Sequence, residues 1–282
     1  MTRWIEEVLH PGLRFKLEAE KVLYDSRTAH QRVVVFENGT LGRVLILDDI
    51  VQTTERDEFV YHEMLSHVPI LAHGAAREVL IVGGGDGGML EETLKHGAIE
   101  RVTMVDIDAG VIELAKTYLR SICKDAFEDP RTDLVIADGV AFVARCDRRF
   151  DVIIVDSTDP VGPGVALFSD DFYRNCRRCL TPGGILVTQN GVPFLQATEL
   201  VNTLTAFRSL FADASCYLAT VPAYVGGPMA FGWGTDDLKA RATPPAVLRA
   251  RFEKAGIETD YYTPEVHASA FTLPVYIARM IS

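Results

Sequence analysis

Two aspartates, Asp156 and Asp159, follow directly on an apolar run at residues 150–155, in the sequence DSTDP. An alkylammonium has a pKa of about 10.4, so at pH 7 it is protonated and is not a nucleophile. Making the neutral amine at pH 7 costs about 4.6 kcal/mol, and a carboxylate that accepts the proton during attack offsets part of this cost. A second carboxylate can hold the cation. The pair is therefore a candidate amine site, with a turn or a helix N-cap as the structural alternative.

A glycine-rich segment, GGGDGG, is the second candidate. Its Gly83, Gly85 and Gly88 have the G-x-G-x-x-G spacing between a predicted strand and a predicted helix, where the backbone can approach a nucleoside closely. Asp106 ends the next apolar run, twenty residues after Asp86, where a carboxylate can accept hydrogen bonds from ribose hydroxyls. Together these residues predict a ribose-bearing ligand. A sharp turn without a nucleotide is the alternative.

Asp86 narrows the choice of ligand. A carboxylate inside the loop repels a pyrophosphate but attracts a cationic tail or a sulfonium, which disfavours a dinucleotide and favours an adenosylmethionine-type ligand. A sulfonium already activates its neighbouring carbon, so holding the amine in line is the main catalytic task we expect. Asp138 and Gly139 follow the third predicted strand, where an acid can accept from an adenine amine. A helix N-cap explains Asp138 equally well, and the residues leave both open.

A parallel sheet is needed to bring these residues together. Apolar runs alternate with stretches long enough for helices, and they lie at residues 79–82, 102–105, 134–136, 150–155 and 185–188. This alternation predicts an α/β fold with a Rossmann-like, doubly wound sheet. Right-handed crossovers then place the ligand crevice at the carboxyl ends of the strands, where the acids are found.

The N-terminal part has a different pattern. Residues 13–52 suit strands, with runs at 21–25, 32–37 and 43–47. The pair Asn38-Gly39 predicts a tight hairpin turn with positive φ at both positions. After residue 56 the apolar residues take helical spacing, at Phe59, Met64, Leu65, Val68 and Leu71. We therefore expect a small antiparallel β domain over residues 1–54 and a Rossmann-like catalytic domain over residues 55–282.

Composition sets limits on the partners. The 282 residues are 48% hydrophobic, and 28 Lys and Arg against 39 Asp and Glu give a formal net charge of -11. This charge disfavours nucleic acid and anionic membranes as partners. There is no apolar run of spanning length, no signal-peptide pattern at the start, and an odd, scattered set of five cysteines. We expect a cytoplasmic protein that acts on small molecules.

Two motifs suggest other chemistry and are set aside. Cys176 and Cys179 have redox spacing, but they precede Leu180 as if at the end of a helix, so a structural role is expected. His62 and His67 are five residues apart, which places them roughly 140° apart around a helix. They cannot share a metal on one helix face, and no metal site is expected.

Three segments resemble, in order and spacing, the spermidine synthases, which form the polyamine aminopropyltransferase family. They are LDDIVQTTERDEFVYHEM at 47–64, VGGGDGG at 82–88 and DSTDPVGP at 156–163, with QNG at 189–191 and VPAY at 221–224 resembling later blocks. The resemblance covers nearly the whole chain. It implies a fold of the class I methyltransferase type and transfer of an aminopropyl group from decarboxylated S-adenosylmethionine to putrescine. The products would be spermidine and S-methyl-5'-thioadenosine. It also implies no permanently bound cofactor, no metal, and a homodimer or homotetramer.

The resemblance also implies residue roles. Asp156 would accept the amine proton and Asp159 would bind the amine. Substrate contacts are further implied for Tyr61, His62, Asp86 and Tyr224. Contacts with the nucleoside are implied for Gln31, Gly83, Gly85, Asp106, Asp138, Gly139 and Pro163, and Trp4 matches less securely.

Two departures from the family pattern bear on specificity. Asp106 stands where relatives often have Glu, and Ala223 stands where Thr is expected, so ribose contact and the shape of the amine pocket are open. The acceptor therefore stays open among putrescine, cadaverine and longer amines. Two other functions are compatible with the residues: an amine N-methyltransferase that uses intact S-adenosylmethionine, and a non-catalytic polyamine or nucleoside sensor.

Overall fold

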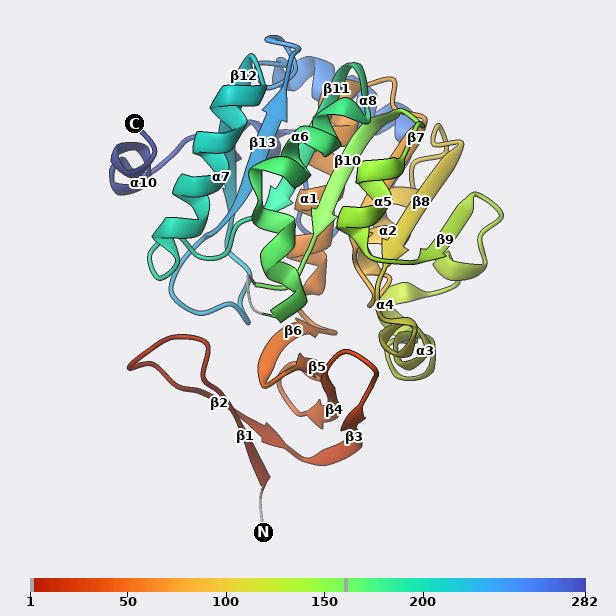
Figure 1. The fold of residues 1–282 in the computed structure, drawn as a ribbon, viewed down its shortest axis with the longest axis vertical. Helices are drawn as coiled ribbons and strands as arrows, with labels where there is room; N and C mark the ends of the chain where they lie inside the picture. The colour runs from red at the N-terminus through yellow and green to blue at the C-terminus, as the bar shows by residue number, and fades with distance from the viewer. Residues whose placement is uncertain (1–2, 160–161) are drawn as a thin grey trace.

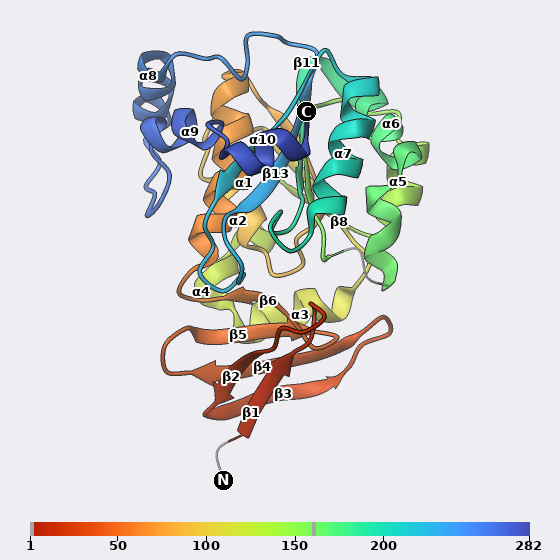
Figure 2. The ribbon, with the colours of Figure 1, turned by 90° about the vertical axis from the view of Figure 1, so that its left-hand side faces the viewer.

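The N-terminal residues form two antiparallel sheets at one end of the molecule, as Figure 1 and Figure 2 show. The computed structural model describes residues 3–159 and 162–282, and the side chains of all of these except 162 and 163. Strands β1 (Arg3–Glu7) and β2 (Phe15–Ala19) form a two-stranded sheet. The four-stranded sheet has the order β3 (Lys21–Arg27), β4 (Arg32–Asn38), β5 (Gly42–Leu47) and β6 (Ile50–Thr54). The expected antiparallel region is confirmed.

The predicted β4–β5 hairpin is present, but the predicted turn is wrong. Asn38 pairs with Gly42, and the left-handed residue is Gly42 at φ 74°. Asn38 instead uses its side chain, whose Oδ1 accepts from the backbone N–H groups of Thr40 and Leu41. The tight turn with two positive φ angles occurs between β5 and β6, at Asp48 (45°) and Asp49 (66°).

A seven-stranded sheet forms the centre of the larger region, in the order β12-β13-β11-β10-β7-β8-β9. Its parallel strands are β7 (Glu78–Gly83), β8 (Arg101–Asp106), β9 (Thr132–Ile136), β10 (Phe150–Asp156) and β11 (Leu180–Gln189). Each contains one of the five predicted runs, so the Rossmann-like fold class is confirmed. The antiparallel edge strands β12 (Asp213–Ala219) and β13 (Met229–Thr235) were not predicted.

Helices cover both faces of this sheet (Figure 2). One face carries α1 (Glu58–His73), α2 (Gly88–Leu94), α3 (Ala109–Tyr118) and the short α4 (Arg120–Cys123). The other carries α5 (Gly139–Arg145), the 3-10 segment η2 (Gly162–Phe168), α6 (Asp170–Arg178) and α7 (Ala197–Leu210). A hydrophobic core lies on each face of the sheet, and alternate residues of β7 pack in one or the other. Val79 and Ile81 face α1 and α2, whereas Leu80 and Val82 face the opposite layer of helices.

Helix α1 is buried nearly all round, from Val60 to Ala72, rather than on the single apolar face that its spacing predicts. Three further helices lie in the C-terminal part of the chain, and the first of them accounts for this difference. They are α8 (Pro245–Ala255), α9 (Pro264–Ala270) and α10 (Val275–Met280). Helix α8 packs on α1 from outside, so α1 lies between the sheet and this C-terminal segment. Within the described parts of the chain, no helix has the length and hydropathy needed to cross a membrane.

Candidate active site

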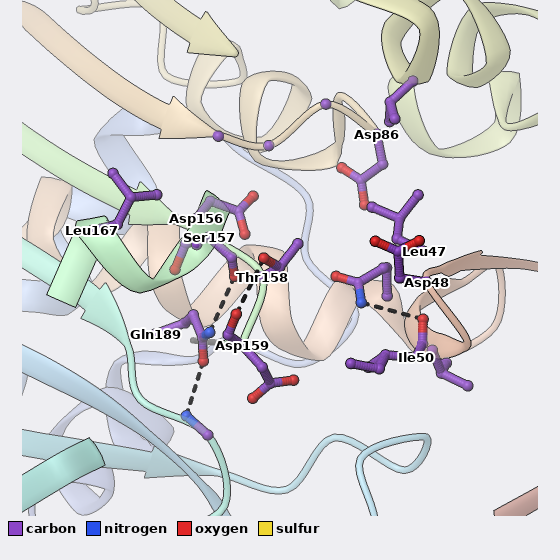
Figure 3. A pocket seen from close by; sticks show the side chains of 18 of the residues that line it. Leu47, Asp48, Ile50, Asp86, Asp156, Ser157, Thr158, Asp159, Leu167 and Gln189 are labelled. Atoms are coloured by element: carbon purple, nitrogen blue, oxygen red, sulfur yellow. Dashed lines mark hydrogen bonds between the residues drawn. The ribbon is translucent and has the colours of Figure 1, made fainter. Parts of the chain in front are cut away.

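A cavity of about 220 Å³ lies at the carboxyl ends of β7, β8 and β10. The glycine-rich loop forms one wall, and residues of the N-terminal sheets, among them Glu7 and Asp48, form the roof. Figure 3 shows Asp86 entering from the glycine-rich loop, while Asp156 and Asp159 enter from the end of β10. The predicted crevice at the carboxyl edge of the sheet therefore exists and holds the predicted acids.

Asp156 ends β10 and is hydrogen-bonded inside the cavity. The Tyr61 hydroxyl donates to its Oδ1 at 2.6 Å. Burial raises the pKa of Asp156 to about 7, and repulsion by Asp86 adds to this rise, whereas the charge of His62 and the bond from Tyr61 oppose it. A carboxyl group with this pKa exchanges a proton readily near neutral pH, as a general base must.

His62 lies between two carboxylates. Its Nδ1 is 2.5 Å from Oε2 of Glu58, one helical turn earlier, and its Nε2 is 3.5 Å from Oδ2 of Asp86. Burial favours the neutral ring, but the charges and hydrogen bonds of Asp86 and Glu58 outweigh it and raise the pKa of His62 well above its usual value. The two carboxylates therefore favour the protonated ring, and the charge of this ring in turn lowers the pKa of Asp86.

The glycine-rich loop needs its glycines for close approach. Gly83 has φ 89°, and a Cβ there would lie 2.0 Å from the carbonyl oxygen of Asp156, so any side chain would push the loop and β10 apart. Gly85 allows the loop to lie close to Asp106, because a Cβ at Gly85 would lie only 3.0 Å from Oδ2 of Asp106. Both glycines of this loop that were predicted to contact a nucleoside, Gly83 and Gly85, line the cavity.

The predicted nucleoside residues gather at the β8 end. Asp106 Oδ1 accepts from the Asp108 N–H at 2.7 Å, and burial raises the pKa of Asp106 to about 6. Gln31 reaches this end from the N-terminal sheet and donates to Asp108 Oδ2 at 3.0 Å. Asp108 was not predicted, although it also caps α3 by accepting from the Gly110 N–H. Asp108 lies two residues after Asp106, and this position could have indicated that it lies near the same end of β8.

Asp138 lines the cavity with Gly139 and also caps α5. Its Oδ1 accepts from the N–H groups of Val140 (2.8 Å) and Ala141 (3.3 Å), so the N-cap alternative is confirmed. The side chain of Pro163 lies outside the described residues. Trp4 is 57% exposed and is not among the residues that line the cavity.

The opposite end of the cavity is aromatic and acidic. The rings of Tyr61 and Tyr224 are perpendicular, with centroids 6.1 Å apart, and the Tyr224 hydroxyl donates to the carbonyl oxygen of Gln52. Burial raises the pKa of Asp159, and a hydrogen bond from Gln196 opposes this rise. Burial also raises the pKa of Glu7. A hydrogen bond from the Val51 N–H opposes this rise, and repulsion by Asp159 adds to it.

Sequence reasoning did not identify several residues that line this acidic end, and these are Glu7, His10, Gln189 and Gln196. Glu7 comes from β1, far from every motif, and no local pattern marked it. Gln196 lies five residues after the QNG segment, whose Gln189 donates to the Ser157 carbonyl oxygen at 3.1 Å.

The ligand atoms of His62, Asp86 and Asp156 all lie within 4.8 Å of one another, a spacing that a divalent cation could bridge. Glu58 engages Nδ1 of the ring, however, and a metal would have to displace the proton that the neighbouring carboxylates favour on Nε2. The set suits an ammonium better than a metal ion. His67 lies elsewhere, with its Nδ1 3.0 Å from Nε2 of His96.

The two cysteines with redox spacing are buried at the end of α6, as expected. Burial raises the pKa of Cys179 to about 11 and that of Cys176 well above its usual value. Both thiols are therefore protonated at neutral pH, which removes the thiolate that redox exchange requires.

Comparisons with known proteins agree with this geometry. Residues 58–243 match the model of the spermine/spermidine synthase domain, and residues 3–55 match that of the spermidine synthase tetramerisation domain. A polyamine aminopropyltransferase of Ruegeria sp. (strain TM1040) is 59% identical over 277 residues, which cover 98% of each chain. Polyamine aminopropyltransferase 1 of Pseudomonas aeruginosa is 54% identical, over 98% of this chain and 96% of the relative.

Solved structures give the same result. A spermidine synthase in complex with the transition state analogue AdoDATO superposes with a TM-score of 0.94 at 34% identity, over 100% of this chain and 96% of that one. The spermidine synthase of Thermotoga maritima gives a TM-score of 0.91 at 33% identity, over 100% and 95%. By the two family models, the full-length relatives and the shared methyltransferase-like fold, the chain belongs to the spermine/spermidine synthase family of polyamine aminopropyltransferases.

Proposed function

We propose that this protein is a spermidine synthase that moves the aminopropyl group of decarboxylated S-adenosylmethionine to putrescine, with Asp156 as the proton acceptor. The observation that carries the proposal is the set of three carboxylates, Asp86, Asp156 and Asp159, around one cavity beside the glycine-rich loop. Both substrates are cations, and a buried group of acids is the complement that two cations need.

The donor fits the side of the cavity that β7 and β8 build. We assign Asp106 and Gln31 to the ribose, and Asp138 and Gly139 to the adenine, because all four line this side of the cavity. Asp86, inside the glycine-rich loop, is assigned to the ammonium of the aminopropyl chain. The complex of a related spermidine synthase with the transition state analogue AdoDATO supports a ligand of this kind.

The acceptor fits the end lined by the two tyrosines. We assign its reacting nitrogen to Asp156 and its distal ammonium to Asp159, with the aliphatic chain along the rings of Tyr61 and Tyr224. Glu7 adds a further carboxylate near Asp159, which raises the attraction for a distal cation. Putrescine as the preferred diamine rests on the family resemblance.

The transfer step balances without a metal or a redox cofactor. The acceptor nitrogen forms a bond to the carbon next to the sulfonium, the C–S bond breaks, and its electron pair leaves S-methyl-5'-thioadenosine neutral. The proton lost by the nitrogen passes to Oδ2 of Asp156, because Oδ1 accepts from the Tyr61 hydroxyl. From Asp156 the proton returns to solvent.

The direct test is a product assay. Purified protein with decarboxylated S-adenosylmethionine and putrescine should form spermidine and S-methyl-5'-thioadenosine in equal amounts. A competition among putrescine, cadaverine and spermidine then ranks the acceptors. Folded protein that gives no product overturns the proposal, and methylputrescine formed from intact S-adenosylmethionine identifies an N-methyltransferase instead.

Activity should depend on pH through Asp156. Its pKa is raised to about 7, so the base form required for catalysis is lost as the pH falls below this value. We expect kcat/KM for the diamine to fall about tenfold per pH unit below pH 7 and to level off above pH 8. Steady-state rates from pH 5.5 to 9 with saturating donor measure this dependence. A flat profile between pH 5.5 and 8 contradicts the assignment.

The wider organisation is part of the proposal. We propose that residues 1–54 and 55–282 are two domains and that the protein works in the cytoplasm as a homodimer or homotetramer. The match of residues 3–55 to a tetramerisation domain supports an oligomer, and five free cysteines suit a reducing compartment. Light scattering coupled to gel filtration distinguishes the dimer from the tetramer.

A further inference from the structure

His62 has a carboxylate on each side, and only one of these partners is a predicted substrate residue. Asp86 faces Nε2 from the cavity side. Glu58 faces Nδ1 from the turn of α1 before His62, and its side chain is 16% exposed against 2% for His62. Glu58 does not line the cavity, so it acts on a ligand only through the ring.

The ring has no room to turn. A Cβ at Gly88 would lie 2.3 Å from its Cε1, which shows that the ring packs directly on the first turn of α2. The Tyr61 ring lies edge-on to it, with centroids 5.3 Å apart. Each nitrogen therefore keeps its present partner: Nδ1 meets Glu58 and Nε2 meets Asp86.

Other charged groups lie around the ring. Asp156 on β10 comes close to both His62 and Asp86. Asp57 lies at the start of α1 and acts on His62 through its charge, but it is engaged by the Thr54 hydroxyl and the Ala223 N–H. Tyr61 donates to Asp156 rather than to the ring. Among these groups, Glu58 is the one in hydrogen-bond contact with Nδ1.

We propose that Glu58 is a positioning residue that keeps a proton on Nδ1 of His62. An ammonium that binds at Asp86 then displaces the proton from Nε2 and donates a hydrogen bond to this nitrogen. This inference rests on the proposed function, because it takes the aminopropyl ammonium as the arriving group.

The exchange is balanced and local. Before binding, the imidazolium donates from Nδ1 to Glu58 and faces Asp86 with Nε2–H. The incoming ammonium brings a like charge beside the ring, so Nε2 gives up its proton to solvent and its lone pair becomes available. Asp86 and Nε2 then both accept from the ammonium, while Glu58 prevents the ring from losing the Nδ1 proton instead. The site keeps one positive charge beside Asp86 in either state.

The test counts protons released on binding. Isothermal calorimetry in buffers of different ionisation enthalpy gives this number as the slope of observed against buffer enthalpy. Two ligands form a matched pair: 5'-(3-aminopropylthio)-5'-deoxyadenosine has the ammonium but no sulfonium, and S-methyl-5'-thioadenosine has neither. At pH 8.5, where Asp156 is mostly ionised, we expect release of up to one proton with the first ligand and almost none with the second.

Glu58→Gln tests the positioning role. The amide keeps the shape but removes the charge that holds the second proton on the ring, so release with the aminopropyl ligand should fall to less than about a third of a proton. The affinity ratio of the two ligands should also lose its dependence on pH. Glu113→Gln, an exposed acid on α3, removes one charge elsewhere and should leave proton release unchanged. Equal weakening of both ligands with unchanged release would reduce Glu58 to a structural role.

His62→Gln provides a second variant should Glu58→Gln fail to fold, because removing the ring should also abolish release. Equal release with both ligands in the unaltered protein overturns the inference even when spermidine is formed. Should neither ligand bind, the proposed function fails. Neutron diffraction on the free protein then still decides the Glu58 contact, by showing whether deuterium occupies Nδ1.

Discussion

Replacing Asp156 with asparagine is expected to lower kcat by about 10²–10⁴-fold, the usual contribution of a general base. Asparagine keeps the carbonyl oxygen that Tyr61 bonds, so the geometry of the cavity should persist. It cannot accept the amine proton, so attack must proceed without a base. Initial rates with both substrates saturating measure the loss. Affinity for S-methyl-5'-thioadenosine should be unchanged, because this neutral product does not need the base.

The same variant should be more stable at pH 8. The pKa of Asp156 is about 7 in the folded protein and about 3.9 in an unfolded chain, so the folded state binds the proton more tightly. Stability is therefore lost as the pH rises through this window. At pH 8 this difference of about three pKa units corresponds to about 4 kcal/mol, and asparagine, which is itself a buried polar group, should recover on the order of 2 kcal/mol of it. Tm should rise by about 4–8 °C.

Asp151, on the same strand β10, is a matched control with opposite expectations. Its Oδ2 accepts from the N–H groups of Arg77 and Glu78, and its Oδ1 accepts from the Thr181 hydroxyl. These bonds outweigh burial and lower the pKa of Asp151. Asp151→Asn should therefore lower Tm and keep kcat. Near-normal turnover in Asp156→Asn, or equal loss in both variants, would remove Asp156 from the role of base.

The contrast between these aspartates explains what the sequence predicts well. Both lie on β10, but only Asp156 is at its carboxyl end, and the carboxyl ends of parallel strands meet at one edge of the sheet. For this reason Asp86, Asp106, Asp138 and Asp156 were all expected to lie near one crevice. The central strands were predictable for a related reason, because a strand buried on both faces is a nearly continuous apolar run.

Other features depend on tertiary context. Strand β13 has the sequence MAFGWGT, in which two glycines hide the strand pattern, although every residue is buried between β11 and β12. Glu7 reaches the cavity because β1 folds over it, which no local pattern reveals. Glu58 is different, since it lies four residues before His62 on a predicted helix. That spacing places the two side chains on one face and could have predicted their contact.

Neighbouring residues of helix α1 face different parts of the protein. Tyr61 and His62 face the cavity, whereas Glu63 faces the C-terminal segment and is 1% exposed. Its carboxylate accepts from the backbone N–H groups of three consecutive residues at 2.6–2.9 Å, and these are Asp260, Tyr261 and Tyr262. A single side chain thus fixes the segment that covers the outer side of α1.

Glu63→Ala should lower the free energy of unfolding by about 3 kcal/mol, because it leaves up to three backbone N–H groups without an acceptor. Each such group costs about 1–3 kcal/mol, and the cost is smaller where water can reach the group. This corresponds to a fall in Tm of about 6–12 °C. Glu63→Gln keeps one acceptor oxygen, so its loss should be about half as large. Glu100→Ala, an exposed acid paired with Arg77, should change stability by less than about 0.5 kcal/mol.

Turnover distinguishes this role from a catalytic one. Below its lowered Tm, Glu63→Ala should keep kcat within about twofold of the unaltered protein, because the residue touches neither substrate. Thermal unfolding and initial rates on the same sample therefore give opposite patterns for Glu63→Ala and Asp156→Asn. An unchanged Tm in Glu63→Ala would show that the C-terminal segment is held on α1 by its apolar contacts, which include Tyr262 and Leu248, rather than by this carboxylate.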